Sequence, residues 1–190
     1  MLYTGRMIQA ICGGLALCLL LSVGGVYGQA KGVREEVLRL HILANSDSTA
    51  DQTLKLQVRD AVTAAAADWA ADSPTEARQT AQEQLPHIEA VARDTLRRAG
   101  CADEVTAELT PMYCTTRQYG NVTLPAGTYD AVRITIGTGK GQNWWCVMYP
   151  PMCVGGATNR DTLSPVTDGE PYILRFKVLE WIESFLQLFR

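Results

Sequence analysis

Residues 37–48 read VLRLHILANSDS, and this stretch decides the fold of the chain. The first eight residues are mostly apolar, and the polar side chains that follow them bond readily to their own backbone. The pattern therefore predicts a strand that ends at a turn. Ser48, with Asp51 three residues later, resembles a capping box with Asp in place of Glu, which indicates that a helix starts here. Apolar residues then recur at helical spacing, at Leu54, Val58, Ala61, Val62, Ala65 and Trp69.

A second helix is expected from Ser73 to Gly100. Ser73 supplies an N-cap, Pro74 stands at the first helical position, and Gly100 suits the C-terminal end. Pro86 lies inside this pattern, and we expect it to kink or split the helix because it has no backbone N–H. Each helix has one apolar stripe, which implies packing against the other helix or across a sheet.

Four strands are expected after the second helix, at residues 104–109, 112–119, 127–136 and 143–149. The segment Gly137-Thr138-Gly139-Lys140-Gly141 lacks the spacing of a phosphate-binding loop, so it predicts a hairpin turn that pairs the last two strands. Residues 172–190 predict an amphipathic helix. The expected fold is α+β: a single domain with a mainly antiparallel sheet, two central helices and a C-terminal amphipathic helix.

The first thirty residues differ from the rest of the chain. Arg6 is the only charged residue before Lys31, and an uncharged, mainly apolar run extends from residue 7 to residue 26. Such a run predicts export across a membrane, and its length is also enough to span a bilayer. Residues 1–30 are therefore expected to be a signal peptide or an N-terminal membrane anchor, and residues 31–190 an exported α+β signalling domain.

The chain has six cysteines. Two lie in the apolar N-terminal run, and the other four are an even number in an exported domain, where disulfides form readily. The disulfide candidates are Cys146, Cys153, Cys101 and Cys114. Pairing of Cys146 with Cys153 is favoured because two prolines between them turn the chain back. Four free buried thiols remain the alternative, and the spacing does not indicate a zinc or other metal site.

Charge and motifs favour a protein that is not an enzyme. The formal net charge is −3 and the basic residues are scattered, so nucleic acid is not an expected partner. Neither G-x-S-x-G nor H-E-x-x-H occurs, and His41 and His87 are the only histidines. We assign no catalytic residue, cofactor or small-molecule substrate. His41 near the Asn45-Ser46-Asp47 turn could be a fragment of an active site, but such a group is more often a strand end with a helix cap.

Adjacent tryptophans are the unusual feature of the last strand. Side chains of neighbouring strand residues point to opposite faces, so Trp144 and Trp145 cannot fill the same core. One of them is therefore a candidate for contact with a partner, since tryptophan is enriched at binding hot spots. The partner-binding candidates are Trp144, Trp145, His41, Asn45, Ser46 and Asp47.

Several blocks, in chain order, resemble the stage II sporulation protein R family. They read LRLHILANSDS at residues 38–48, DQTLKLQVRDAV at 51–62, GTGKG and NWWCVMYPPMC within 137–153, and RFK with EW within 175–181. The resemblance implies a protein that is made in the forespore and secreted across the forespore membrane into the intermembrane space, where it stays tethered or is released. It also implies that the protein activates a membrane-embedded aspartic peptidase, which processes the precursor of sigma-E.

Two other functions also fit the sequence. One is an envelope hydrolase that uses His41 with Ser46, or a free Cys146. The other is a passive structural module in the same space between the two membranes.

Overall fold

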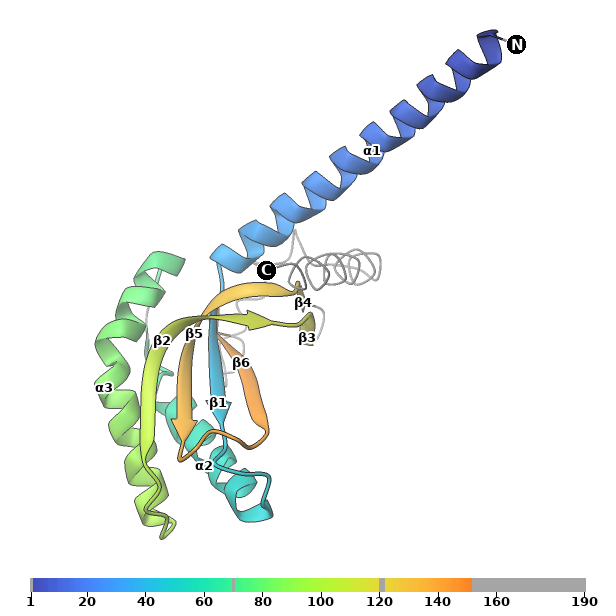
Figure 1. The fold of residues 1–190 in the computed structure, drawn as a ribbon. Helices are drawn as coiled ribbons and strands as arrows, with labels where there is room; N and C mark the ends of the chain where they lie inside the picture. Colours follow the sequence, from blue (N-terminus) through green and yellow to red (C-terminus); the bar gives the residue numbers. More distant parts are fainter. Residues whose placement is uncertain (1, 70, 120–121, 152–190) are drawn as a thin grey trace.

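The computed structural model describes residues 2–69, 71–119 and 122–151 (Figure 1). In chain order the elements are α1 (Leu2–Glu35), β1 (Leu38–Leu43), α2 (Thr49–Ala65), α3 (Pro74–Arg98), β2 (Val105–Cys114), β3 (Arg117–Tyr119), β4 (Val122–Leu124), β5 (Gly127–Ile136) and β6 (Asn143–Tyr149). This order and the mainly antiparallel pairing confirm the predicted α+β class. The expected C-terminal helix at 172–190 and Cys153 lie outside the described residues.

The four-stranded sheet has the strand order β2-β5-β1-β6. β1 pairs in parallel with β5 and antiparallel with β6, and β2 pairs antiparallel with β5. The predicted hairpin between residues 127–136 and 143–149 is therefore wrong. β1 separates these two strands, and it is buried on both faces, as is typical of a central strand. The glycine-rich loop between them consequently crosses the end of β1.

The strand predicted at residues 112–119 is also corrected. Its first three residues belong to β2, which runs without a break from Val105 to Cys114, whereas Arg117–Tyr119 forms β3 and pairs with β4. Pro111 is tolerated inside β2 because β2 lies at the edge of the sheet, where a missing N–H costs no ladder bond.

Both predicted helix starts are confirmed by their caps. The side chain of Ser48 accepts a hydrogen bond from the backbone N–H of Asp51, and Ser73 accepts one from Glu76. At the other end of α3, Gly100 has φ 77° and the N–H of Cys101 donates to the carbonyl of Leu96, at 2.9 Å. This is the glycine-terminated end that the sequence indicates.

Pro86 does not split the second helix. α3 is one helix from Pro74 to Arg98 with Pro86 inside it, so the expected division is wrong. Its buried stripe of small and aliphatic side chains, from Ala77 to Leu96, packs on the sheet and continues past the proline. That packing offsets the cost of the missing N–H.

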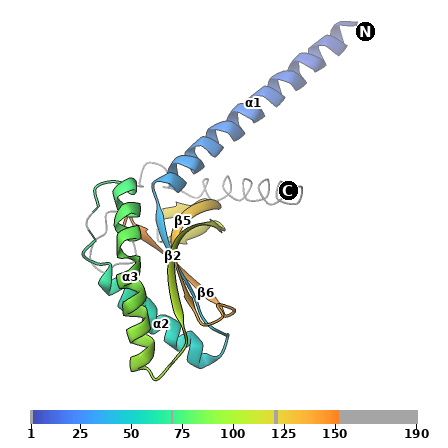
Figure 2. The ribbon, with the colours of Figure 1, turned by 60° about the vertical axis from the view of Figure 1, so that its left-hand side comes forward.

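The two faces of the sheet are covered differently (Figures 1 and 2). α2 and α3 pack on one face, where alternate residues of β1 and β5 meet the buried residues of both helices in the main core. On the other face a smaller cluster combines the end of α1, β4 and parts of β5 and β6. Its buried members are Val33, Val37, Cys114, Val122, Leu124, Tyr129 and Val147.

α1 extends away from the sheet for most of its length (Figure 1). Only its last turns join the domain, where Ala30 and Val33 are buried. Within the described part of the chain, no helix has both the length and the apolar composition that a membrane crossing needs.

Candidate functional site

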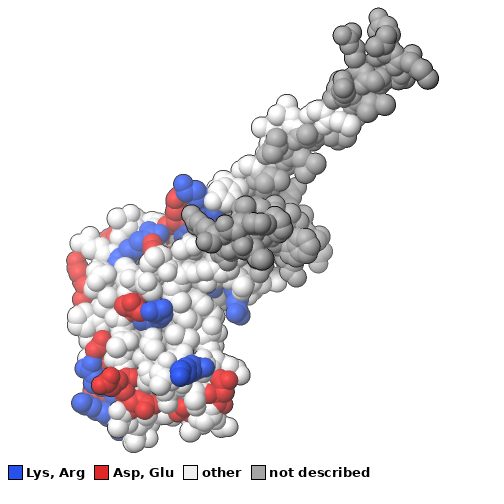
Figure 3. Space-filling model, in the orientation of Figure 1, with Lys and Arg blue, Asp and Glu red and all other residues white. Residues whose placement is uncertain are grey.

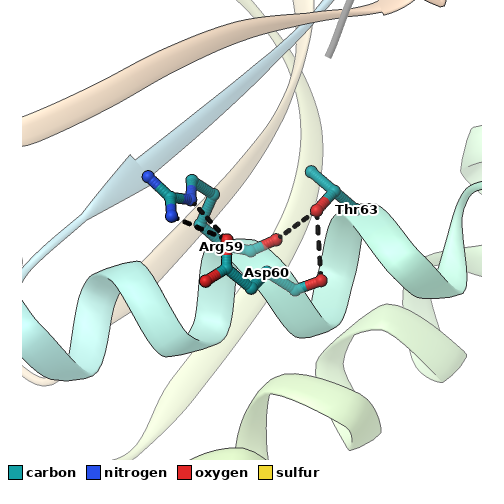
Figure 4. Close-up of polar contacts among 3 residues, drawn as sticks. All are labelled: Arg59, Asp60 and Thr63. Carbon is teal, nitrogen blue, oxygen red and sulfur yellow. Dashed lines mark hydrogen bonds and ion pairs between the residues drawn. The ribbon is translucent and has the colours of Figure 1, made fainter. Parts of the chain in front are cut away.

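Trp144 and Trp145 lie on opposite faces of the sheet, as the sequence predicts. Trp144 packs against the main core, and the guanidinium of Arg59 on α2 lies 5.3 Å from the centroid of its ring. Arg59 Nε also donates to Asp60 Oδ1 at 2.8 Å, and the Thr63 hydroxyl donates to the carbonyls of both residues (Figure 4). Trp144 is therefore held beneath a helix.

Trp145 packs on the opposite face, against His41. The two rings are 3.8 Å apart between centroids, with 15° between their planes. His41 and Trp145 are direct partners in the β1–β6 register, so the strand pairing sets this stack. His41 is 3% exposed, whereas Trp145 is only half-buried. The outer side of the indole is thus the accessible part of the pair.

Arg39, which sequence reasoning missed, lies beside this stack and is completely buried. Its guanidinium carbon lies 5.0 to 5.8 Å from the ring centroids of Tyr119, Tyr129 and Trp145. One of its nitrogens, Nη2, donates to the Tyr119 hydroxyl at 2.7 Å, but Nε and Nη1 have no hydrogen-bond partner in the described part of the molecule. An arginine in the middle of an apolar strand is the signal that would have pointed to it.

His41 is uncharged at neutral pH. Burial, and then the charges of Arg133 and Arg39, lower its pKa to about 4. Its two ring nitrogens have no hydrogen-bond partner among the described residues. The Ser46 hydroxyl instead donates to the Asp51 carboxylate at 2.6 Å. His41 and Ser46 therefore do not form the nucleophile–base pair that the alternative hydrolase requires.

The predicted Asn45–Asp47 turn is bonded to the glycine-rich loop. Asn45 Oδ1 accepts from the N–H of Thr138 at 2.9 Å, and Asp47 Oδ1 accepts from the N–H of Gln142 at 2.6 Å. The N–H of Gly141 donates to the carbonyl of Ala44 at 2.9 Å. We call these contacts between residues 44–47 and 137–142 the clamp.

Two side chains of α2 donate further hydrogen bonds to the clamp. Gln52 Nε2 donates to the carbonyl of Ser46 at 2.9 Å, and Lys55 Nζ donates to the carbonyl of Gln142 at 3.0 Å. Lys55 is 5% exposed, and burial lowers its pKa. Gly141 is required by the close approach of two backbones, because a Cβ there would stand 2.2 Å from the carbonyl oxygen of Ser46.

The structure thus gives the predicted partner-binding residues different roles. The polar side chains of the turn, those of Asn45, Ser46 and Asp47, form hydrogen bonds to other groups of the same chain. The bonds of Asn45 and Asp47 fix the loop that leads into β6. Trp145 and His41 form a stack that the clamp holds in place through β6 and β1. Among these candidates, the half-buried Trp145 presents the accessible aromatic surface on the face opposite α2 and α3.

The cysteine prediction is corrected in part. Cys101 and Cys114 are free thiols and belong to different clusters, so the structure does not pair them. Cys146 is not among the free cysteines of the described chain, and its predicted pairing with Cys153 stays a prediction. Within the described ranges, no group of three His, Cys, Asp or Glu residues is placed to hold a metal ion.

Comparison with known proteins identifies the family. The family model for stage II sporulation protein R matches residues 34–159, which contain the clamp, Arg39 and both tryptophans. Stage II sporulation protein R of Bacillus subtilis (strain 168) is 39% identical over 140 residues. These cover 73% of this chain and 62% of that protein, so the match spans less than two thirds of the relative's length. No solved structure matches the chain. The chain therefore belongs to the stage II sporulation protein R family.

Proposed function

We propose that this chain is an exported sporulation signal that activates a membrane-embedded aspartic peptidase, which processes the precursor of sigma-E. On this proposal the chain is not an enzyme. It is secreted across the forespore membrane into the intermembrane space, with residues 1–30 as a signal peptide or a tether. Family membership supports the sporulation role, and the accessible Trp145 on the sheet face that α2 and α3 do not cover is the observation that carries the docking step.

The strand register defines the surface around Trp145. Residues paired across the sheet share a face, and one such row is Glu108, Arg133, His41 and Trp145. The next row toward the clamp is Thr106, Thr135, Leu43 and Asn143. All of these side chains except His41 are exposed or half-buried. We call the two rows the open face, and propose that it docks on the exposed part of the peptidase.

Docking explains activation through a shift of populations. An activator favours the active arrangement of its target only by binding that arrangement more tightly than the inactive one. A surface held in place by strand pairing and by the clamp suits this task, because little conformational entropy is lost when it binds.

The test is co-expression of the peptidase and its substrate precursor with and without this chain. Processing should appear only when the chain is present, and unchanged processing would refute the signalling role. Trp145→Ala should reduce processing while the soluble variant stays folded, and Trp145→Phe should retain more activity because it preserves a ring over His41.

Trp144 supplies the matched comparison. Trp144→Ala should lower the melting temperature, because the ring packs on the core beneath Arg59, but the folded fraction should still activate. If neither soluble tryptophan variant loses activation, the docking surface lies elsewhere.

A further inference from the structure

A buried positive charge, the guanidinium of Arg39, lies beside the open face. Arg133 pairs with the exposed Glu108, with Nε donating to Oε1 at 2.7 Å. No carboxylate pairs with Arg39 in the described part of the chain, although this guanidinium is completely buried. Among the described residues, Arg133 thus has a carboxylate partner and the buried Arg39 has none.

A buried guanidinium without a counter-charge is unusual. Arginine stays protonated in proteins, and removing its charge from water is costly unless an anion or good hydrogen bonds compensate. The three rings around Arg39 supply cation–π attraction, which covers only part of that cost. Within the described ranges, its Nε and Nη1 have no hydrogen-bond partner. The incompletely compensated charge of Arg39 therefore indicates that an anionic group binds close to it.

Trp145 links the buried charge to the surface. Its ring lies 5.3 Å from the guanidinium carbon of Arg39 and stacks on the neutral ring of His41. Trp145 is therefore the residue of the open face that lies directly against the buried guanidinium. Arg133 stands next to His41 in the same row and is itself partly exposed.

The surrounding surface also favours a peptide-like partner. In the view of Figure 3, uncharged atoms cover much of the domain below α1, with charged groups of both signs scattered between them from the base of α1 to the lower end. The open face itself combines an aromatic platform, the aliphatic Leu43 and small hydroxyl side chains with the single ion pair of Arg133 and Glu108. Aromatic and apolar contacts next to a cation suit a segment that mixes apolar and acidic side chains.

We propose that the open face binds an acidic segment of the partner protein, with a carboxylate at Arg133 and an apolar side chain on Trp145. This proposal rests on the proposed function, since it names the chemistry of the surface that the activator recognises. Glu108 competes with the partner for Arg133 and keeps the site neutralised before docking.

Charge variants of the full chain test the proposal in the co-expression assay. Arg133→Glu should reduce precursor processing about tenfold or more, because a like charge then faces the partner's carboxylate. Arg133→Gln should cause a smaller loss, and it guards against a failure of the reversed charge to fold. Glu108→Gln should retain or raise activity. The matched control is Arg98→Glu on α3, whose side chain is 82% exposed and lies outside the open face.

A binding measurement separates this proposal from the proposed function. Purified full-length chain is titrated with a synthetic peptide of alternating Glu and Phe, and intrinsic tryptophan fluorescence is followed at low and high salt. Binding that weakens with salt and is lost in Arg133→Glu, but not in Arg98→Glu, supports the acidic-segment site even if processing does not respond. A wild-type chain that activates processing while Arg133→Glu performs equally well overturns it. Equal binding of single-stranded DNA would also overturn it, since the site would then be a general anion site.

Discussion

The indole of Trp145 lies parallel to the imidazole of His41, with 3.8 Å between the ring centroids and 15° between the planes. This contact joins the central strand β1 to the edge strand β6 and stands beside the buried guanidinium of Arg39. The stack therefore couples an accessible aromatic surface to two buried polar groups. The stability of the stack depends on keeping His41 neutral, so it should vary with pH.

Acidification should destabilise the chain through His41. The unfolded chain takes up a proton at this position near pH 6.5, whereas the folded chain resists it until about pH 4. Between these values the unfolded state binds more protons, so stability falls as the pH falls, by about 3 kcal/mol in total. Urea unfolding measured at several pH values from 7 to 4 would show the loss.

The control for this prediction is His41→Phe. Phenylalanine keeps a ring under Trp145 but does not titrate, and the carboxylates of the two proteins are the same. The variant should therefore lose less stability than the wild type over the same range. Parallel pH profiles for the two proteins would contradict the assignment to His41.

Gly141 should tolerate no side chain, because the clamp brings two backbones together there. Gly141→Ala would place a Cβ 2.2 Å from the carbonyl oxygen of Ser46, which cannot move without breaking the turn. We expect a loss of about 2 kcal/mol or more in the free energy of unfolding. Gly32→Ala is the matched control, since an added Cβ meets nothing within 4 Å there. Similar melting temperatures for both variants would show that the clamp is looser than its geometry indicates.

Pro86→Ala should stabilise α3. The side chain is exposed, so little packing is lost, and the new N–H can donate to the carbonyl of Gln82. The gain is expected to be about 1 kcal/mol, because the unfolded chain also becomes more flexible without the proline. Thermal unfolding measures the change. A lower melting temperature would mean that the helix depends on a local distortion at the proline.

Local signals predicted the helices well, but they did not predict how the strands pair. Ser48, Ser73 and Gly100 fix helix ends through hydrogen bonds to neighbouring residues, and these bonds can be recognised from short sequence patterns. The pairing of β5 with β1 joins residues more than ninety positions apart, such as Leu40 and Val132. A glycine-rich loop alone cannot distinguish a hairpin from a connection that crosses another strand.

The candidate site shows the same division. The alternation of strand residues correctly placed Trp144 and Trp145 on opposite faces, because it depends only on the pleat. Which face a helix covers depends on tertiary packing, and so the sequence could not tell that Arg59 lies over Trp144. The polar turn at Asn45 was interpreted as a possible contact surface, whereas the clamp occupies it with contacts from a loop more than ninety residues away.

The thiols should differ sharply in reactivity. Cys101 is half-buried, whereas Cys114 is 3% exposed and burial raises its pKa, so only Cys101 should react quickly with a thiol reagent in the native state. The measurement uses a full-length chain that carries Cys12→Ser and Cys18→Ser, because both of those thiols are exposed. Cys114 should react only after unfolding, and Cys101→Ser should abolish the fast phase.

If the predicted Cys146–Cys153 disulfide forms, two further thiols should appear in denaturant only after reduction. Their appearance without reductant would show that this bond is absent and would restore Cys146 as a candidate nucleophile.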